Sequence, residues 1–352
     1  MNAPELAEMT KTIPIDWPKF DRTRALVLGG AGFIGMAVCE GIMQGGGTVF
    51  AVDFDHDPAT PFAAHDMAKF VERTMHADVT DFDMVMRLFA EAQPDLVIHL
   101  AAMSQVTHCM VAPLQAFKTN ALGTANVLEA CRITRMPKAI VIASTDKVFG
   151  DWGEAEANDE TPLRPRHPYD ASKAAGDMLA QTYAQQYDLP LVVTRCGNVY
   201  GPGDVNWDRL VPGVIRSLLA GRRPTLRSDG QYVREFNYIA DIANAYCIVA
   251  SKLLGGSLRG KTYTISNGEA HKVADVVHML QRFVPGGEVL EPVFGDRAQN
   301  ETRVLRLNAE RFGKETGWKA VMSLEDGLKS TVAWMQFYLG IALEDGDEPD
   351  RS

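Results

Sequence analysis

Short runs of apolar residues alternate with helical patterns through the first half of the chain. The apolar runs cover residues 25–28, 48–52, 96–100, 139–143 and 191–194. Helical patterns lie between them, over residues 33–43, 81–92, 113–134 and 169–187, and Thr80 is the expected cap of the second. Strands that alternate with helices of this length indicate βαβ units and a parallel sheet. We therefore expect an α/β fold built on a doubly wound parallel sheet.

After Tyr200 the pattern changes to loops rich in glycine, proline and charge, with short helices. Residues 239–253 have a helical pattern and residues 262–265 the pattern of a strand, so both are expected to return to the sheet. The predicted organisation has four parts. They are an N-terminal arm (1–22), the Rossmann-type sheet domain (23–200, with 237–266 returning to it), a smaller α/β substrate-binding domain (201–236 and 267–340) and an acidic tail (341–352).

Composition and charge narrow the classes of partner. The 352 residues are 46% hydrophobic and 23% charged, which is typical of a soluble globular protein. A net charge of -10 argues against nucleic acid or an anionic membrane as partner. The five cysteines are scattered without metal-site spacing, so we expect reduced thiols, no metal and a cytoplasmic location. No apolar run approaches the roughly 20 residues that span a bilayer.

A glycine-rich segment follows the first predicted strand and opens the first helix. Gly29, Gly32 and Gly35 have the spacing that permits a tight turn, close approach to a pyrophosphate and packing of helix on strand. Residues 33–34, Phe33 and Ile34, complete this loop. Asp53 ends the second strand, where an acid binds the adenosine ribose and repels a 2′-phosphate. A glycine turn without ligand is the alternative, but this context favours an NAD site.

Groups capable of acid–base chemistry are expected at the end of the strand over residues 139–143. Tyr169 and Lys173 lie one turn apart on one helix face, and a lysine beside a phenol lowers the pKa of the phenol. Tyr169 would then act as a base near neutral pH. Ser144, Thr145, Asp146 and Lys147 directly follow the strand. The spacing therefore predicts hydroxyl, phenol, carboxyl and amine groups in one catalytic site.

Taken together, these segments resemble the extended short-chain dehydrogenase/reductase family, whose members act on nucleotide sugars. The similarity runs from Ala25 to about Leu339, and its matching segments are residues 29–35, 99–102, 119–124, 144–145, 169–173 and 195–203. The resemblance implies NAD as cofactor and a homodimer that pairs the helices over 113–134 and 169–187. The further NAD-binding residues that we expect are Asp78, Val79, Leu100, Ala101, Ala102, Asn120, Ser144, Tyr169 and Lys173. For Asp78 a solvated loop position is an equal alternative.

The Asp146-Lys147 pair narrows the reaction that the resemblance implies. It is similar to the pair in CDP-glucose 4,6-dehydratases, as are residues 203–212 and 300–308, although Asn300 and Asn308 depart from that pattern. The implied reaction converts an NDP-hexose to its 4-keto-6-deoxy form, with CDP-glucose favoured. Tyr169 takes the C4 hydroxyl proton, Thr145 or Ser144 binds the C4 oxygen, Lys147 removes the C5 proton and Asp146 protonates the departing C6 hydroxyl. Lys173 supports Tyr169.

Several polar residues are candidates for binding the sugar nucleotide. The resemblance points to Asn198 and Arg234 at the diphosphate, with Arg209, Arg303 and Ser104 as further candidates. A surface salt bridge is an equal interpretation of Arg209 and Arg303. Two other functions remain open at this stage. A nucleotide-sugar 4-epimerase would leave Asp146 and Lys147 without a chemical role, and an NAD-binding protein without turnover would not need a tuned phenol.

Overall fold

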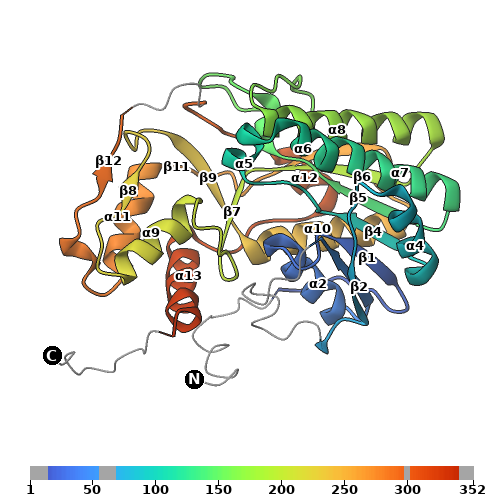
Figure 1. Cartoon of the computed structure of the whole chain (residues 1–352), viewed down its shortest axis with the longest axis horizontal. Helices are drawn as coiled ribbons and strands as arrows, with labels where there is room; N and C mark the ends of the chain where they lie inside the picture. Colours follow the sequence, from blue (N-terminus) through green and yellow to red (C-terminus); the bar gives the residue numbers. More distant parts are fainter. Residues whose placement is uncertain (1–14, 55–68, 297–301, 341–352) are drawn as a thin grey trace.

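The predicted doubly wound parallel sheet is confirmed. The computed structural model describes residues 15–54, 69–296 and 302–340. Its large sheet has seven strands in the order β10-β6-β5-β4-β1-β2-β3, all paired in parallel (Figure 1). The strands are β1 (Arg24–Leu28), β2 (Thr48–Asp53), β3 (Arg73–His76), β4 (Leu96–His99), β5 (Ala139–Ala143), β6 (Leu191–Cys196) and β10 (Lys261–Ile265).

Helices cover both faces of this sheet, because its central strands are apolar on both sides. Along β1, Leu26 and Leu28 pack on one face, whereas Ala25 and Val27 pack on the other. The first face is covered by α4 (Phe82–Ala92), α7 (Gly123–Thr134) and α8 (Pro168–Tyr187). The second is covered by α2 (Phe33–Gln44) and α10 (Ile239–Leu254), which completes the three layers.

The strand order reverses beside β1. The chain runs outward from β1 to β2 and β3, and then crosses to β4 on the other side of β1. The connections that leave β1 and β4 therefore diverge and open a crevice at the carboxyl ends of these strands. In open α/β sheets this crevice is where ligands bind, so the topology places a site there before any side chain is considered.

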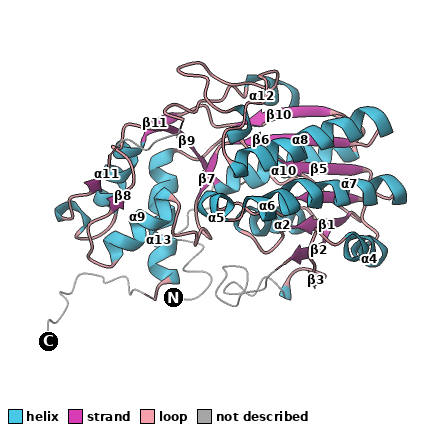
Figure 2. Ribbon diagram, turned by 45° about the horizontal axis from the view of Figure 1, so that its top comes forward, coloured by secondary structure: helices cyan, strands magenta, loops and turns pink. Residues whose placement is uncertain are grey.

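A smaller unit packs beside the carboxyl ends of the sheet (Figure 2). It contains a three-stranded sheet in the order β11-β9-β7 and a two-stranded sheet of β12 and β8. Its strands are β7 (Asn198–Tyr200), β8 (Thr225–Leu226), β9 (Val233–Tyr238), β11 (Ala270–Lys272) and β12 (Val293–Phe294). Its helices are α9 (Leu210–Leu219), α11 (Val273–Phe283), the 3-10 turn η4 (Gly287–Val289) and α13 (Leu324–Tyr338). Its strands were not expected from the sequence, since most are too short for a periodic pattern.

Three local features differ from the expectations. Asp81, rather than Thr80, caps α4, because its carboxylate accepts the backbone N–H of Met84 at 3.0 Å. The predicted helix over 113–134 is interrupted by a π-helical turn. It comprises α6 (Pro113–Phe117), η2 (Lys118–Leu122) and α7, and is preceded by α5 (Val106–Val111). An additional helix, α12 (Glu310–Thr316), places Phe312 in the core of the large sheet domain.

The predicted arm and tail are described only in part. Within residues 15–22, Phe20 is buried and Trp17 packs against the α2 side of the core. Residues 1–14, the tail over 341–352 and Asn300 lie outside the described residues. Among the helices that the structure describes, none is long and apolar enough to cross a membrane.

Candidate active site

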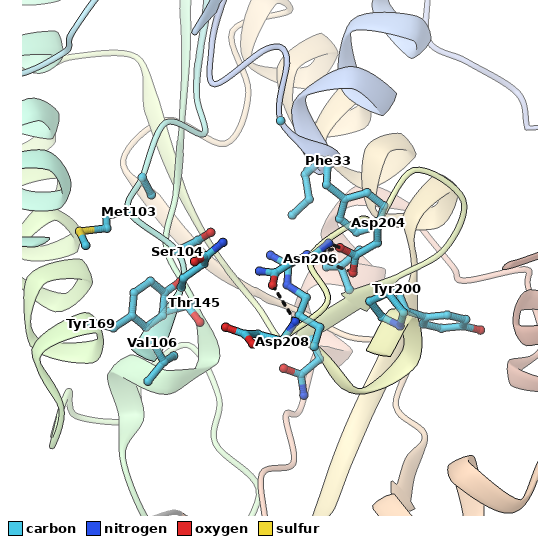
Figure 3. Close-up of a pocket in the computed structure, with 18 of the residues that line it drawn as sticks. Phe33, Met103, Ser104, Val106, Thr145, Tyr169, Tyr200, Asp204, Asn206 and Asp208 are labelled. Atoms are coloured by element: carbon cyan, nitrogen blue, oxygen red, sulfur yellow. Dashed lines mark hydrogen bonds and ion pairs between the residues drawn. The ribbon is translucent and has the colours of Figure 1, made fainter. Parts of the chain in front are cut away.

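A cleft of about 1000 Å³ lies at the carboxyl ends of the sheet strands. One wall consists of the segments that follow β1, β2, β4 and β5, and the opposite wall is contributed by residues of the smaller unit. Figure 3 shows Thr145 and Tyr169 on one side of this space, facing Asp204, Asn206 and Asp208 on the other. The cleft therefore joins the two units, and most of the predicted site residues line it.

Gly29 and Gly35, in the loop after β1, have no room for a side chain. Gly29 has a φ of +83°, and a Cβ there would lie 2.6 Å from the backbone nitrogen of Ala101. A Cβ at Gly35 would overlap the carbonyl oxygen of Gly29. The glycines thus bring the start of α2 directly against the end of β1, and Gly29, Gly32, Phe33, Ile34 and Gly35 all line the cleft.

Asp53 connects the end of β2 to this loop. Its carboxylate accepts the backbone N–H of Ala31 at 3.2 Å and that of Phe54 at 2.8 Å, and the residue lines the cleft. Asp78 also lines the cleft beside Val79, while its carboxylate accepts the backbone N–H of Thr80 at 2.8 Å. Both expected positions are therefore on the wall. The binding of adenine by Asp78 stays a prediction.

This part of the cleft fits a dinucleotide. The glycine cradle exposes the N-terminus of α2, where backbone N–H groups and the helix dipole favour a pyrophosphate. Leu100, Ala101 and Ala102 line the neighbouring wall. The hydroxyl oxygen of Ser144 is buried in the same cleft and has no hydrogen-bond partner among the described residues. A buried polar atom without a partner is costly, so a bound ligand with polar groups would satisfy it.

Thr145 connects the two predicted catalytic segments. It precedes the 3-10 turn η3 (Asp146–Phe149), and its hydroxyl donates to the Asp146 carboxylate at 3.0 Å. The same hydroxyl is hydrogen-bonded to the Tyr169 phenol, which α8 presents at the cleft. All five predicted catalytic residues line the cleft: Thr145, Asp146, Lys147, Tyr169 and Lys173.

The expected effect of Lys173 on Tyr169 is not seen. Burial raises the pKa of Tyr169, and the nearby Asp146 carboxylate raises it further. The buried Lys173 ammonium instead donates to the carbonyl oxygen of Ala143 at 2.6 Å, at the end of β5. Burial lowers the pKa of Lys173 to about 8. Helical spacing placed the two side chains on one face, but the nearest acceptor for the ammonium is a strand carbonyl.

Lys147 is half-buried, lines the cleft and faces an acid of α8. The pKa of Asp170 is raised by burial, and this rise is opposed by the positive charge of Lys147. The ammonium is thus close to the start of α8, one residue after Tyr169. This position brings an amine to the same side of the cleft as the phenol and Thr145.

Asn120 is the one predicted cofactor residue that does not line the cleft. It is buried in η2. Its side-chain oxygen accepts the backbone N–H of Met103, and its side-chain nitrogen donates to the Met103 carbonyl and, at 2.9 Å, to the Ser172 hydroxyl. Asn120 therefore holds the loop after β4 against α8. His99 is a hydrogen-bonded core residue, with its ring nitrogen 3.1 Å from the hydroxyl of Thr124.

The candidate arginines have different environments. Arg209 lines the cleft, with its guanidinium 3.2 Å from the buried Asp204 carboxylate. Arg234 also lines the cleft, but donates to three backbone carbonyls of residues 302, 303 and 233. Arg303 does not line the cleft in the part of the chain described, and pairs with Asp229 at 3.5 Å. Asn198 and Ser104 are on the wall.

Three residues at the cleft are linked by hydrogen bonds that the sequence did not predict. The carboxylate of Asp208 accepts from the Thr107 hydroxyl at 3.3 Å and from Arg227 at 3.4 Å. Thr107 belongs to α5, Asp208 to the loop before α9 and Arg227 to the segment after β8. All three line the cleft, as does Trp207. Asp208 falls inside the noted segment 203–212, whereas Thr107 and Arg227 have no distinguishing pattern. Among the described residues, no cluster of histidine, cysteine or acidic side chains is arranged to hold a metal ion.

Comparison with known proteins agrees with this geometry. Residues 25–265 match the NAD dependent epimerase/dehydratase family. The chain is 32% identical to dTDP-glucose 4,6-dehydratase 1 of Escherichia coli K12 over 340 residues, which cover 88% of this chain and 92% of that protein. It is 31% identical over 270 residues to a trifunctional UDP-glucose 4,6-dehydratase of Arabidopsis thaliana, covering 76% of this chain and 39% of that protein.

Solved structures show the same architecture in two kinds of enzyme. A dTDP-glucose 4,6-dehydratase of Bacillus anthracis, in complex with NAD, superposes with a TM-score of 0.80 at 26% identity, covering 89% of this chain and 96% of that one. A UDP-glucose 4-epimerase of Thermotoga maritima superposes with a TM-score of 0.81 at 27% identity, covering 90% and 99%. The fold, the glycine cradle and the match over most of the chain agree, and this chain belongs to the NAD dependent epimerase/dehydratase family, the extended short-chain dehydrogenases/reductases.

Proposed function

We propose that this protein is an NAD-dependent nucleotide-sugar 4,6-dehydratase, which converts an NDP-hexose to an NDP-4-keto-6-deoxyhexose. The observation that carries the proposal is the arrangement of Asp146, Lys147 and Tyr169 in one cleft, with Thr145 bonded to both Asp146 and Tyr169. Oxidation at C4 needs a base such as the phenol. Elimination across C5 and C6 additionally needs a base and an acid, which the adjacent amine and carboxyl provide.

The glycine cradle, Asp53 and Ser144 are the groups that would hold NAD. When bound, NAD supplies the hydride acceptor for C4 and the hydride donor for C6. Because the hydride returns to the same sugar, the cofactor ends each turnover in its starting state. The close packing around Gly29 and Gly35 holds the start of α2 against the end of β1, where its backbone donors would face the pyrophosphate.

In this proposal Tyr169 reacts as the phenolate, which accepts the proton of the C4 hydroxyl and becomes the neutral phenol. Burial and Asp146 raise its pKa, and the positive charge of Arg209 opposes that rise. The Thr145 hydroxyl, already bonded to Tyr169, is placed to stabilise the oxygen at C4 as charge develops there. Lys173 then acts from the end of β5, where its ammonium fixes the strand carbonyl beside the site.

The elimination uses the two residues that directly follow Thr145. Lys147, as the neutral amine, removes the C5 proton that the C4 ketone has made acidic, and Asp146 donates a proton to the departing C6 hydroxyl. Asp146 is 4% exposed, and its carboxylate is held by the Thr145 hydroxyl, so its direction in the cleft is fixed. A buried acid with a fixed direction is suited to protonating a leaving group.

The nucleotide is proposed only as a class. The CDP-glucose preference expected from the Asp146-Lys147 pair has no support from the relatives, which are named for dTDP-glucose and UDP-glucose. Arg209 and Arg234, with Asn198, are the cleft residues suited to a diphosphate, since guanidinium groups match phosphate geometry. Arg303 does not line the cleft and is not assigned to the substrate.

A 4-epimerase is the second candidate, because the Thermotoga maritima epimerase shares the fold. Epimerisation at C4 uses the phenol and the cofactor but has no step for an acid and a base beyond them. Both Asp146 and Lys147 line the cleft and are directed by η3, and this placement favours the dehydratase.

Mass spectrometry of the purified protein with CDP-, dTDP-, UDP- and GDP-glucose tests the proposal. A product lighter by one water establishes the dehydratase and identifies the nucleotide. Asp146→Asn should lower kcat at least about 100-fold, the usual contribution of a general acid. Asp83→Asn, an exposed acid on α4, is the matched control and should keep the parent rate. A product of unchanged mass and altered stereochemistry would establish the epimerase instead.

A further inference from the structure

Glu235 of β9 is a buried acid that the reaction described above does not use. Its side chain is 4% exposed, and one carboxylate oxygen, Oε1, accepts the backbone N–H of Leu307 at 2.7 Å. The side chain also bonds Ser266. The other oxygen, Oε2, is buried and has no hydrogen-bond partner among the described residues. A buried carboxylate oxygen without a partner is costly, so its surroundings need an explanation.

The unpartnered oxygen and a carboxylate oxygen of Asp146 both lie beside Gly197. A Cβ placed on Gly197 would lie 3.4 Å from Glu235 Oε2 and 3.7 Å from Asp146 Oδ2. It would also lie 3.2 Å from the side-chain nitrogen of Asn237. Two carboxyl groups from different elements, β9 and η3, therefore face one small space. Gly197 places no side chain of its own in this space, which the Asn237 amide nitrogen also faces.

The electrostatics of this space favour a bound proton. Burial is the main cause that raises the pKa of Glu235 to about 7, and the negative charges of Asp146 and Glu156 raise it further. Burial raises the pKa of the Cys196 thiol at the end of β6, and the negative charges of Asp146 and Glu235 raise it further. The charge of Asp146 also raises the pKa of Tyr169 from α8. The Thr145 hydroxyl and the Asn237 amide nitrogen are the neutral groups beside this space, whereas Glu235, Asp146, Cys196 and Tyr169 are acids. A proton held between the two carboxyl groups relieves their repulsion.

We propose that Glu235 is a positioning residue for the dehydration. With Asp146 it forms a buried pair of carboxyl groups that holds one proton, and this is the proton that the elimination consumes. This inference rests on the proposed function and assigns Glu235 a part in it. Like charges in close proximity raise each other's affinity for a proton, and the pair therefore titrates as a unit.

The pair of Glu235 and Asp146 supplies a proton that the reaction needs in each turnover. In each turnover Tyr169 gains the proton of the C4 hydroxyl, and Asp146 loses one to the hydroxyl that leaves C6 as water. Lys147 takes the C5 proton and returns it to C5. Thr145 is bonded to both Tyr169 and Asp146, which provides a path for the proton to return. Once the pair has given up its proton, two like charges lie close together, and their repulsion favours that return.

The first test is the pH profile of kcat for the full-length Glu235→Gln protein with bound NAD. Gln keeps the shape and can accept from Leu307, but it removes the like charge beside Asp146. The alkaline limb should move to lower pH by about one unit or more, the shift expected for coupled carboxyls. At pH values above the shifted alkaline limb, kcat of Glu235→Gln should then be about tenfold lower than that of the parent, while KM is unchanged. Asp83→Asn, which removes an exposed acid of α4 that is not among the groups acting on Glu235, is the matched control and should not move the limb.

The second test reads the pair without substrate. Infrared difference spectroscopy between acid and alkaline pH should show a carboxylic acid band in the parent that disappears near neutral pH. That band should be absent from Glu235→Gln and should move to lower pH in Asp146→Asn, because removing either partner removes the repulsion. Parent-like behaviour in Asp146→Asn, or a uniform loss of rate in Glu235→Gln without a shifted limb, would overturn the inference.

The two tests separate this inference from the proposed function. If the parent releases a dehydrated sugar but the band does not respond to Asp146→Asn, the dehydratase stands and the pair is rejected. If the parent forms no dehydrated product from any nucleotide sugar, the catalytic role of Glu235 is rejected together with the dehydratase, even where the band behaves as a pair.

Discussion

Single glycines decide whether the cofactor loop can form. Gly35 is required because a Cβ there would overlap the Gly29 carbonyl oxygen, and Gly29 because of its positive φ and its contact with Ala101. Both requirements arise where the first helix meets the first strand. The spacing in the sequence anticipated these positions, since only glycine satisfies both demands.

Gly35→Ala should therefore disrupt cofactor binding and fold stability together. Overpacking of this kind costs about 1–3 kcal/mol, and displacement of the loop removes the backbone donors that face the pyrophosphate. The measurements are the amount of NAD that co-purifies and the midpoint of urea unfolding. Gly255→Ala is the control, because its Cβ would make only ordinary contacts of 3.5–3.6 Å. Full NAD content in Gly35→Ala would contradict the assigned role of the loop.

The titration of Glu235 also predicts a pH dependence of stability. Its pKa rises from 4.5 to about 7 on folding, so the folded state holds a proton that the unfolded state has released. The stabilising contribution is complete below about 4.5 and is lost as pH rises through about 7. The melting temperature of Glu235→Gln minus that of the parent should therefore be larger at pH 8 than at pH 5. Melting temperatures of both proteins at the two pH values check this, and an equal difference at both would refute it.

At the scale of elements, strands and helices of the large sheet were predictable because they carry strong local signals. The runs that became β4 and β5 are buried throughout, as an interior parallel strand requires. The strands of the smaller unit are two to six residues long and pair with segments distant in sequence, as β7 does with β9. Such pairing is a tertiary property, so the sequence pattern did not reveal it.

The N-cap of α4 lies one residue from the position predicted from the sequence. Thr80 and Asp81 are both suitable N-cap residues, and the structure selects Asp81 through its bond to the Met84 N–H. Asp81→Ala should lower the free energy of unfolding by about 1 kcal/mol, the usual contribution of an N-cap. Thr80→Ala should have a much smaller effect. Urea denaturation of the two variants decides between these residues, and a larger loss for Thr80→Ala would restore the original expectation.

At the scale of the whole molecule, the α5–α8 side carries exposed apolar residues. Leu114 of α6 is 69% exposed and Met178 of α8 is 60% exposed, and these helices pack beside each other. The family resemblance predicts that this side pairs across a two-fold axis. Apolar residues exposed in one region are typical of an interface between protein chains.

The double variant Leu114→Glu/Met178→Glu should convert a dimeric parent to a monomer. Charged side chains at the centre of an apolar interface would lose their hydration on association. Light scattering coupled to gel filtration measures the mass of both proteins. Val289→Glu is the control, because Val289 is 81% exposed in η4 of the smaller unit. A monomeric parent, or a variant that stays dimeric, would reject this interface.

The sequence by itself determined the features that depend on near neighbours in the chain. The parallel sheet follows from periodicity, the cofactor loop from glycine spacing, and the catalytic cluster from its position after β5 and at the start of α8. Each of these is set within a few residues by backbone geometry and side-chain direction.

Only the tertiary structure decided where the charges point and which distant residues meet. In the tertiary structure Lys173 donates to the Ala143 carbonyl, and Asn120 and Arg303 lie away from the cleft wall. Glu235 and Asp146 both lie beside Gly197. These outcomes depend on burial and on contacts between elements far apart in sequence. A pKa or an ion pair is set by that local environment, which no pattern along the chain contains.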